Sequence, residues 1–426
     1  MELSSVITIM SLKITPYTGT KAFTRAGTSA DRVLGVVPGI VVKPRSLDEV
    51  SEVLGWATKE GLKVVPCGSR TKLDRGAAPG GCDILLDVSS LDQVVEHAAG
   101  DLTVTVQTGV RLSDLQRQLA GAGQFLAVDP PVPGTVGGLI ATADTGPRRL
   151  RYGGVRDLIL GVTFVRADGV IAKAGGKVVK NVAGYDLPKL LTGALGTLGV
   201  VAEATFRLYP LPAASATVVA NIPPNELRRH VGTILQSTLV PTSLDYFAQS
   251  SGPSTLAVRF ESTQASVSAQ AKFTAQLLGG SSRIVTGEEE QAVWAQFDGI
   301  SDTVERDVLC KLVSTVSDLE GLLERASRAA REAGTELTVR AHAGYGHALL
   351  RWRGGTADAA VALVQGLRAE AEALGHNLIV WRAPAEVRSR VDVWGDVGEG
   401  LSLMRKVKQQ FDPNGTLNPG RFVGGI

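Results

Sequence analysis

The sequence predicts an α+β protein of two domains, or of one domain with a large insertion. The chain has 426 residues, more than one ordinary hydrophobic core accommodates, and its apolar fraction of 44% is that of a globular protein. Residues 40–65 alternate strand-like and helix-like stretches as a β-α-β unit does. Beyond a proline-rich stretch at residues 210–224, the patterns are those of a split βαβ, ferredoxin-like domain.

The β-α-β unit has clear boundaries. An apolar run at residues 40–42 closes at Pro44, and Ser46 with Glu49 has the spacing of a capping box. The apolar residues at 50, 53, 54 and 57 then lie on one helix face, and Gly61 ends the helix. A second strand leads into residues 66–74, PCGSRTKLD. Its glycine, hydroxyl side chains and cations make it a candidate anion-binding loop.

Residues 102–110 predict a further strand, and leucines at 112, 115 and 119 predict a helix that Gly121 ends. The most glycine-rich stretch follows at residues 133–169, where threonines and arginines are interleaved with the glycines. Glycine lets backbone N–H groups approach a ligand, so this composition is typical of a site for a phosphate-bearing cofactor. A loop at a sheet edge has the same composition, and that alternative stays open.

The second half of the chain shows two copies of one pattern. We expect the first copy to contain strand 255–261, a helix, and strand 309–315. A helix, strands 336–342 and 347–353, another helix and strand 377–383 follow. Together they predict an antiparallel sheet with helices on one face. The last 26 residues predict a helix and a turn-rich tail that docks elsewhere on the molecule.

Composition excludes several classes of protein. The 44 basic residues nearly balance the 42 acidic ones, so we expect no nucleic-acid partner. Three cysteines at unrelated spacings argue against a disulfide scaffold, a structural zinc site or an iron–sulfur cluster, and favour a reducing cytoplasm. No apolar run is long and uninterrupted enough to predict a transmembrane segment. Neither a Walker A loop nor a Rossmann fingerprint in its proper context is present.

Five segments in order carry a resemblance: PCGSRTKLD, the stretch 134–169, GGKVVKNVAGYDLPKL, GTLGVVAEATFRLYP and FDPNGTLNPGRFVGG. In these the chain resembles the vanillyl-alcohol oxidase/p-cresol methylhydroxylase FAD superfamily. Within it the chain looks most like the E subunits, the FAD-binding subunits of bacterial glycolate oxidases. The resemblance is strong over roughly residues 35–213 and 400–426 and weak between them.

The resemblance implies a two-lobed PCMH-type FAD-binding domain, with a ferredoxin-like α+β cap. It implies an N-terminal extension at 1–34, an FAD-binding domain at 35–213, a cap or substrate domain at 214–399 and a returning C-terminal segment at 400–426. The resemblance also implies which residues meet the cofactor: two segments that bind its diphosphate, a backbone stretch at its adenine end and one residue beside its isoalloxazine ring. The residues that match them are Cys67, Gly68, Ser69, Arg70, Thr71 and Lys72; Gly134, Thr135, Val136, Gly137, Gly138 and Thr142; Gly199 and Val200; and Asn418.

Two details of the cofactor site follow from the resemblance. The segment KNVAGYDL, with Lys180, Asn181, Gly184 and Tyr185, matches one that packs against the cofactor. Covalent attachment in the superfamily uses a histidine or cysteine at set places. The first loop has no histidine, and its Cys67 stands where the family motif varies. We therefore expect non-covalent FAD, with Cys67 as a small buried residue.

Candidates for the chemistry come from residues 340–353, RAHAGYGHALLRWR. The comparable stretch in the 2-hydroxyacid dehydrogenases of the family reads GHxGDGNxH. Here Tyr345 replaces the aspartate and Leu349 the last histidine, so we predict no metal site. Arg340, His342 and His347 are the candidate catalytic residues. The alternative is a structural hairpin whose histidines form hydrogen bonds only with their neighbours. For Arg382 and Trp381 there are also two interpretations: they bind a carboxylate, or they only form the edge of the sheet.

The resemblance implies an FAD-dependent oxidoreductase that acts on the CH–OH group of a 2-hydroxy acid of the glycolate or lactate type, by hydride transfer to flavin N5. A larger FAD subunit and an iron–sulfur subunit are the implied partners. We expect the protein in the cytoplasm, or held by these partners at the inner face of the membrane. Two alternatives remain: a self-sufficient alcohol or 2-hydroxyacid dehydrogenase or oxidase, and a flavoprotein subunit that does not turn over.

Overall fold

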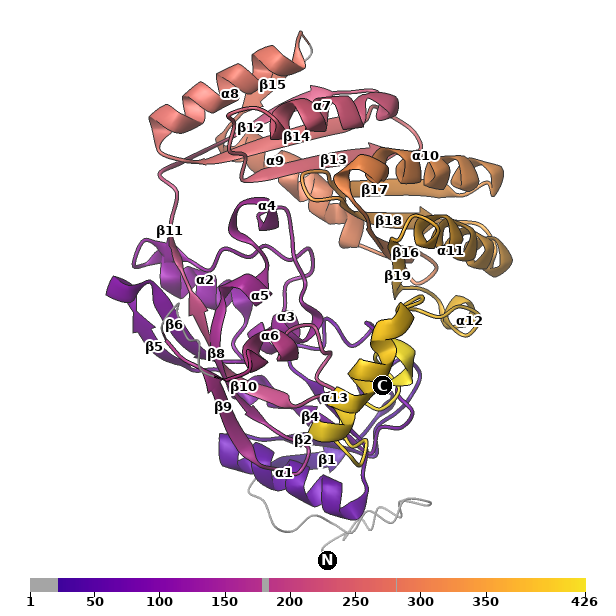
Figure 1. Ribbon diagram of the computed structural model, residues 1–426. Coiled ribbons are helices and arrows are strands. Elements are labelled where there is room, and N and C mark those ends of the chain that lie inside the picture. Colours follow the sequence, from indigo (N-terminus) through magenta and orange to yellow (C-terminus); the bar gives the residue numbers. More distant parts are fainter. Residues whose placement is uncertain (1–21, 178–183, 281) are drawn as a thin grey trace, which may run out of the picture.

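The computed structural model describes residues 22–177, 184–280 and 282–426 (Figure 1). Two small α/β lobes lie at one end of the molecule, and one wide sheet with its helices lies at the other (Figure 1). We call these the first lobe, the second lobe and the cap. The predicted α+β class is confirmed.

The first lobe is a sheet in the order β1-β2-β4-β3, parallel except for its edge strand β1. Residues 22–34, assigned from sequence to an extension, supply that edge strand. The connecting helix is capped as expected, because Ser46 Oγ accepts from the Glu49 N–H and Gly61 ends it in the left-handed region at φ 70°. The elements are β1 (Phe23–Ala26), β2 (Ile40–Lys43), α1 (Leu47–Glu60), β3 (Val64–Cys67) and β4 (Ile84–Asp87).

The second lobe is an antiparallel sheet in the order β5-β6-β10-β8-β9, with its helices packed over an apolar face that includes Phe164 and Phe206. Its strands are β5 (Val94–Ala98), β6 (Thr103–Gln107), β8 (Ile159–Val165), β9 (Ile171–Gly175) and β10 (Val200–Arg207), with the small pair β7 (Gln124–Phe125) and β11 (Tyr209–Pro210). Its helices are α2 (Leu112–Ala120), α3 (Val136–Thr142), α4 (Arg149–Tyr152), α5 (Val155–Leu158) and α6 (Leu187–Leu191).

The cap is one eight-stranded antiparallel sheet in the order β15-β12-β14-β13-β17-β18-β16-β19. Each half has the ferredoxin-like strand order, and the pairing of β13 with β17 joins the halves. The strands are β12 (Ala214–Asn221), β13 (Ser243–Gln249), β14 (Thr255–Ser262), β15 (Arg283–Val285), β16 (Val308–Val313), β17 (Glu336–His342), β18 (His347–Arg353) and β19 (Asn377–Arg382). Strand 309–315 therefore opens the second copy rather than closing the first.

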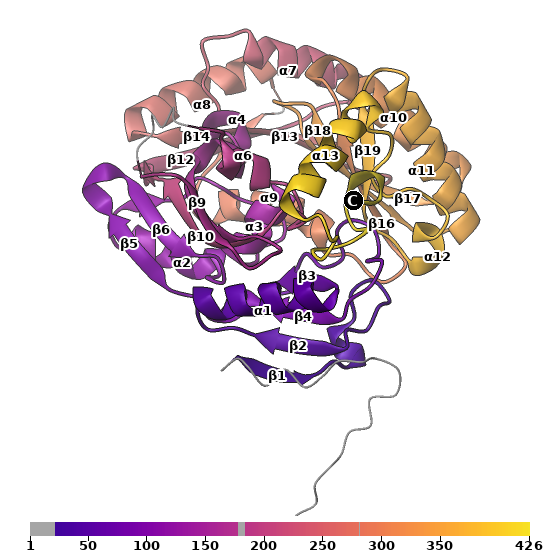
Figure 2. The ribbon, with the colours of Figure 1, turned by 60° about the horizontal axis from the view of Figure 1, so that its bottom comes forward.

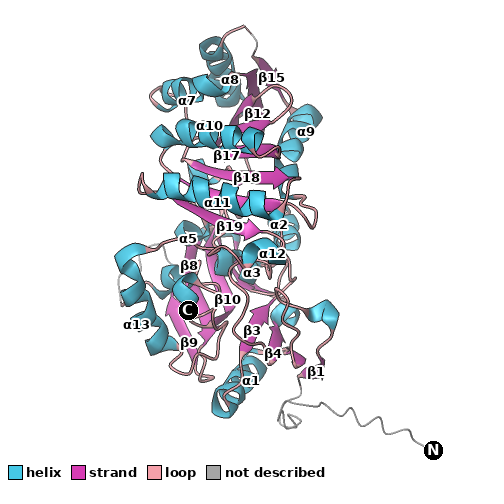
Figure 3. Ribbon diagram, turned by 90° about the vertical axis from the view of Figure 1, so that its right-hand side faces the viewer, coloured by secondary structure: helices cyan, strands magenta, loops and turns pink. Residues whose placement is uncertain are grey.

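Four helices cover one face of the cap sheet, as the sequence predicts (Figure 3). They are α7 (Leu227–Leu235), α8 (Gln264–Leu278), α10 (Val316–Glu332) and α11 (Ala357–Glu372). The expectation of helices on one face only is wrong for α9 (Gly287–Asp298), which lies on the opposite face. Trp294 and Phe297 of α9 pack there against Val219 and Phe247, residues of the side of β12 and β13 that the other helices leave uncovered.

The C-terminal segment leaves the cap through α12 (Ala385–Arg388) and returns to the lobes with α13 (Leu401–Phe411), drawn in yellow (Figures 1 and 2). The tail then pairs beside β3, where Leu417 forms a parallel bridge with Val64 and the Asn418 N–H donates to the Val64 carbonyl at 2.8 Å. The predicted docking of the tail is confirmed, and its partner is the strand that precedes the first candidate loop.

Candidate functional site

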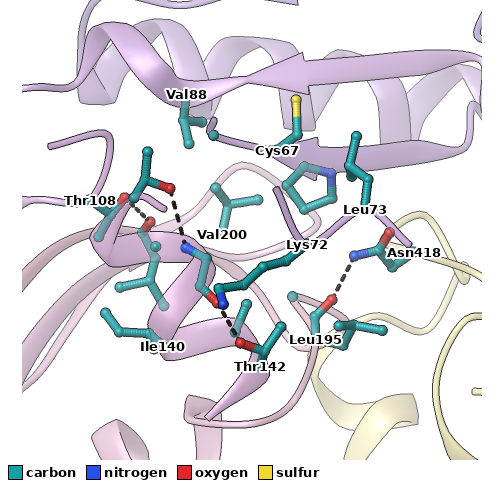
Figure 4. A pocket seen from close by; sticks show the side chains of 18 of the residues that line it. Cys67, Lys72, Leu73, Val88, Thr108, Ile140, Thr142, Leu195, Val200 and Asn418 are labelled. Atoms are coloured by element: carbon teal, nitrogen blue, oxygen red, sulfur yellow. Dashed lines mark hydrogen bonds between the residues drawn. The ribbon is translucent and has the colours of Figure 1, made fainter. Parts of the chain in front are cut away.

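A pocket of about 790 Å³ lies where the two lobes and the tail meet (Figure 4). It collects segments that are far apart in the chain: the loop after β3, helix α3, the start of β10 and the tail. The predicted residues that line it are Cys67, Gly68, Ser69, Arg70, Thr71, Lys72, Thr135, Gly137, Gly138, Thr142, Gly199, Val200 and Asn418. Gly134 and Val136, also predicted, flank Thr135 behind this lining.

The loop 67–72 presents backbone donors. The N–H groups of Ser69, Arg70 and Thr71 donate to no acceptor in the described chain, and Arg70 has a left-handed φ of 64°. The Arg70 side chain serves the loop itself: its Nη1 lies 2.7 Å from Asp31 Oδ1. Asp31 also binds Arg25, and hydrogen bonds from both arginines hold the pKa of Asp31 far below its usual range although burial opposes this. The guanidinium of Arg70 thus anchors the loop.

The two predicted diphosphate segments are in direct contact. A Cβ at Gly68 would lie 2.3 Å from Thr135 Oγ1, and one at Gly134 would lie 2.5 Å from Thr71 Oγ1. Both glycines are therefore required for the close approach of the segments. Thr135 Oγ1 also caps α3 by accepting from the Gly138 N–H at 3.4 Å. The glycine-rich stretch is consequently a packed wall of the pocket, and the alternative of a free edge loop does not apply.

Lys72 differs from the expected anion-binding cation. Its Nζ is paired with the buried carboxylate of Asp144 and donates to the Val132 carbonyl at 2.9 Å. Burial alone would raise the pKa of Asp144, but the charges of Lys72 and Arg75 outweigh it and lower this pKa. The charge of Lys72 is therefore largely neutralised before any ligand binds.

The tail closes one end of the pocket. Asn418, with φ 46°, donates from Nδ2 to the Leu195 carbonyl at 2.6 Å (Figure 4). Its Oδ1 accepts from Arg421 Nη1 at 3.3 Å. Arg421 also lines the pocket, and its Nη2 donates to the carbonyls of Leu73 and Arg75 at 2.7 Å. Burial lowers the pKa of Arg421 to about 10. Sequence reasoning missed Arg421. The only signal for it in the sequence is its position three residues after Asn418.

The cap brings two of the predicted catalytic residues together around an unpredicted carboxylate. Asp245 on β13 is fully buried, and its oxygens lie 3.0 Å from His342 Nδ1 and 3.0 Å from Arg340 Nε on β17. Asp298 binds Arg340 from the other side. Burial lowers the pKa of His342 and outweighs the opposite effect of Asp245. Arg340 is 1% exposed, so its guanidinium holds Asp245 instead of meeting a ligand.

The third candidate, His347, lies across the β17–β18 hairpin and pairs with His342 in the ladder. Burial and the charges of Lys311 and Arg149 lower the pKa of His347 to about 3, so its imidazole is neutral near pH 7. The Tyr345 ring stacks on His342 at 5.2 Å, and its hydroxyl donates to the Gly146 carbonyl of the second lobe at 3.1 Å. The hairpin turn thus touches the glycine-rich stretch.

Three further cations contact aromatic rings of this hairpin or of β19, and we call these residues, Arg75, Arg149 and Lys311, the cation cluster. Lys311 Nζ and Arg75 Cζ lie 5.6 and 4.0 Å from the centroid of Trp381, and Arg149 Cζ lies 5.3 Å from that of Tyr345. Burial lowers the pKa of Lys311 to about 8, with Asp144 opposing and Arg149 and Arg75 adding to the effect. The field of Asp144 links the cluster to Lys72 in the pocket wall.

The remaining predicted residues lie elsewhere. Arg382 is bound by Asp74, so it does not present a free guanidinium. Lys180 and Asn181 lie outside the described residues, and Tyr185 is 92% exposed. Within the described ranges, no group of three or more histidine, cysteine, aspartate or glutamate residues has an arrangement that could hold a metal ion. No helix among the described residues is long and apolar enough to cross a membrane.

Comparison with known proteins finds two family profiles in the chain. The profile of the "FAD binding domain" family matches residues 38–175, and that of the "FAD linked oxidases, C-terminal domain" matches residues 396–422. The chain therefore carries an FAD-binding domain. Both matched ranges contribute to the pocket, through the loop 67–72 and α3 on one side and Asn418 on the other.

Individual relatives point the same way. "Glycolate oxidase subunit GlcD" of Bacillus subtilis (strain 168) is 36% identical over 218 residues, which span 50% of this chain but only 46% of that protein. "D-lactate dehydrogenase" of Archaeoglobus fulgidus is 29% identical over 411 residues, 90% of this chain and 91% of the relative.

A solved structure of "p-cresol methylhydroxylase with substrate bound" superposes with a TM-score of 0.69 at 17% identity, covering 91% of this chain and 89% of that one. It shows the fold. With the family profiles and relatives, it confirms three predictions: the superfamily relationship, the PCMH-type α+β fold, and FAD as the cofactor. The relatives are FAD-linked oxidoreductases of 2-hydroxy acids, which agrees with the predicted enzyme class.

Proposed function

We propose that this chain binds FAD non-covalently between its lobes and oxidises a 2-hydroxy acid to the 2-oxo acid. The observation that carries the proposal is the junction at the tail end of the pocket. There Asn418 and Arg421 close the cofactor pocket, while the Lys72–Asp144 pair in its wall reaches Lys311 of the cap electrostatically. Because Arg421 of the pocket lining also donates to the Arg75 carbonyl, the cofactor pocket adjoins the cation cluster.

The pocket fits FAD in three respects. The free N–H groups of Ser69, Arg70 and Thr71 supply donors for a diphosphate, and Gly68 and Gly134 let the two segments meet around it. The same pocket is also lined by the start of β10 and by the tail, as a site for a cofactor stretched between the lobes would be. Gly199 and Val200 would offer backbone to the adenine end and Asn418 to the isoalloxazine. Burial raises the pKa of the Cys67 thiol to about 12, which favours a non-covalent cofactor.

FAD supplies a hydride acceptor, flavin N5, when it is bound. The chain supplies the rest. Lys311 attracts the substrate carboxylate, because its ammonium has no anionic partner among the described residues. His342 accepts the hydroxyl proton at Nε2, since Asp245 occupies Nδ1. As the C2–H bond gives up its hydride, the C2–O bond becomes a carbonyl. Arg340 does not contact the substrate; it donates to Asp245 and positions that carboxylate.

The purified chain tests the proposal directly. It should show a flavin spectrum, or acquire one on reconstitution with FAD. Anaerobic addition of a panel that includes glycolate, both lactate enantiomers and 2-hydroxyglutarate should bleach that spectrum. His342→Ala should retain FAD and lose bleaching. A chain that cannot bind FAD would refute the proposal, and a His342→Ala variant with unchanged reduction kinetics would remove His342 from the mechanism.

We further propose an FAD-binding domain at 35–213, to which residues 22–34 add the edge strand β1, a cap at 214–399 and a returning segment at 400–426. We also propose a place in the cytoplasm or at the inner face of the membrane. We propose a larger FAD subunit and an iron–sulfur subunit as partners, of which the iron–sulfur subunit takes the electrons. The relation to a glycolate oxidase subunit supports this. Bleaching by substrate without any added subunit, followed by turnover with oxygen or a quinone alone, would instead favour a self-sufficient enzyme. An FAD-bound chain that no hydroxy acid reduces would favour a non-catalytic subunit.

A further inference from the structure

Lys311 is a cation without an anionic partner. It lies on β16, on the side of the cap sheet that carries Trp381, and it forms neither an ion pair nor a hydrogen bond with any described residue. Its contact with Trp381 at 5.6 Å is an attraction to an aromatic face and does not neutralise its charge. A shielded ammonium of this kind is unfavourable unless a ligand anion completes it.

Arg149 is a second such cation, on a different element. It begins α4 of the second lobe, and its guanidinium also has no carboxylate partner among the described residues. Its position is fixed by the hairpin: the Tyr345 ring lies 5.3 Å from Arg149 Cζ, and a Cβ at Gly344 would lie 2.7 Å from Leu150 Cδ2. Arg149 therefore meets the His342 side of the site, whereas Lys311 meets the Trp381 side.

The nearby carboxylates are committed to other partners. Asp144 is paired with Lys72, Asp245 with His342 and Arg340, and Asp74 with Arg382. Asp74 also lies 3.7 Å from Arg75, the third cation of the cluster. Asp129 accepts from the Arg148 N–H, and burial raises the pKa of its carboxyl to about 7, so it carries only part of a charge near neutral pH. The described protein therefore leaves Lys311 and Arg149 for a ligand.

We propose that the substrate is a 2-hydroxydicarboxylate, with one carboxylate on Lys311 and the other on Arg149. The inference rests on the proposed function, since it concerns the same site. A monocarboxylate would pair with one of the two cations and leave the other without an anion, whereas a dicarboxylate pairs with both. The oxidation itself is unchanged: the hydride of C2–H reduces FAD, the hydroxyl proton goes to His342, and both carboxylates remain intact in the 2-oxo product.

The test compares two acids of equal chain length, 2-hydroxyglutarate and 2-hydroxyvalerate, each as both enantiomers. Anaerobic flavin reduction should be faster with 2-hydroxyglutarate, by about tenfold or more in the ratio of rate constant to dissociation constant. Arg149→Met should lower that preference by about tenfold or more, because it removes the partner of the second carboxylate. Arg151→Met, on the same helix but exposed, should leave the preference unchanged.

A measurement without turnover guards against variants that fold poorly. Glutarate, which lacks the hydroxyl, should perturb the flavin absorption of the FAD-loaded protein. Titration of that change should give a lower dissociation constant for glutarate than for valerate. Equal reduction by 2-hydroxyvalerate and 2-hydroxyglutarate, or a preference that Arg149→Met does not alter, would overturn the inference while leaving the proposed function intact. Reduction by neither acid, with FAD bound and glutarate without effect, would overturn both.

Discussion

Single side chains in this molecule fall into two electrostatic groups. Lys72, Arg340 and Arg70 are buried or half-buried cations that each have a carboxylate within the fold, so they shape the site without offering charge to a ligand. Lys311 and Arg149 have none among the described residues. Composition alone cannot separate the groups, because the difference lies in which aspartate the fold brings to each cation.

The pKa of Lys311 makes a prediction about pH. Because burial lowers this pKa to about 8, the ammonium loses its proton as the pH rises through that value in the free enzyme. We expect kcat/KM for acid substrates to be highest below pH 8 and to fall above it, since the neutral amine no longer attracts a carboxylate. Steady-state kinetics between pH 6 and 10 measure this fall in kcat/KM, the falling limb of the pH profile.

Lys311→Arg provides the control, because a guanidinium stays charged throughout that range. The falling limb should then move above pH 10 or disappear. The groups that act electrostatically on Lys311, or feel its charge, are Asp144, Arg75, Arg149, His342 and His347. A limb near pH 8 that persists in Lys311→Arg would assign the titration to another group.

Asp245 supports a second prediction at this scale. Asp245→Asn keeps the shape of the side chain but removes the charge that fixes His342 through Nδ1. We expect kcat to fall by about a hundredfold or more while FAD affinity stays within about twofold, because an unoriented imidazole accepts a proton poorly. The pH profile of kcat should shift with it. Asp298→Asn, at the exposed side of Arg340, should change kcat far less.

At the scale of elements, local signals were predictable and long-range pairings were not. Ser46, Glu49 and Gly61 predicted the boundaries of α1 because capping acts within one helical turn. Strand β13 was missed, and with it Asp245, since the register that sets Phe247 opposite Arg340 joins segments separated by 93 positions in sequence. The cofactor loops were found through their resemblance to a family, because glycine and threonine alone do not distinguish a cofactor wall from an edge loop.

The contact between the two cofactor segments predicts the effect of adding a single methyl group. Gly68→Ala would place a Cβ 2.3 Å from Thr135 Oγ1, so the loop or α3 must move. We expect FAD affinity to fall by about tenfold or more, because the loop donors lose their alignment. Fluorescence titration of the apoprotein with FAD measures the change.

Gly100→Ala is the matched control for that titration. A Cβ at Gly100 meets nothing within 4 Å, and its φ is not in the left-handed region. The variant should therefore bind FAD as the parent protein does. Equal affinities of Gly68→Ala and Gly100→Ala for FAD would show that the approach of the two segments does not govern binding.

On the scale of the whole molecule, one short segment connects the parts. Arg148 forms a bidentate ion pair with Glu261 of β14 in the first half of the cap, at 2.6 and 3.1 Å. The neighbouring Gly146 carbonyl accepts from Tyr345 in the second half. The glycine-rich stretch thus forms a wall of the cofactor pocket through α3 and, a few residues later, bears contacts from both halves of the cap.

The tail makes the last connection, and Asp412 holds its turn. The carboxylate of Asp412 is 2% exposed and accepts from the N–H groups of Thr416 and Leu417 at 2.9 and 2.7 Å and from Lys408 at 2.6 Å. Asp412→Ala leaves the two N–H groups unpaired, whereas Lys408 keeps the carbonyls of Thr197 and Leu417 as acceptors. The substitution should destabilise the tail by about 1–3 kcal/mol.

Because Asn418 and Arg421 follow this turn into the pocket, Asp412→Ala should lower both the FAD affinity and the unfolding temperature. Added FAD should restore part of that temperature by mass action. Glu399→Ala, an exposed acid just before α13, should change neither quantity. Loss of stability in Asp412→Ala with unaltered FAD affinity would show that the pocket forms without the tail.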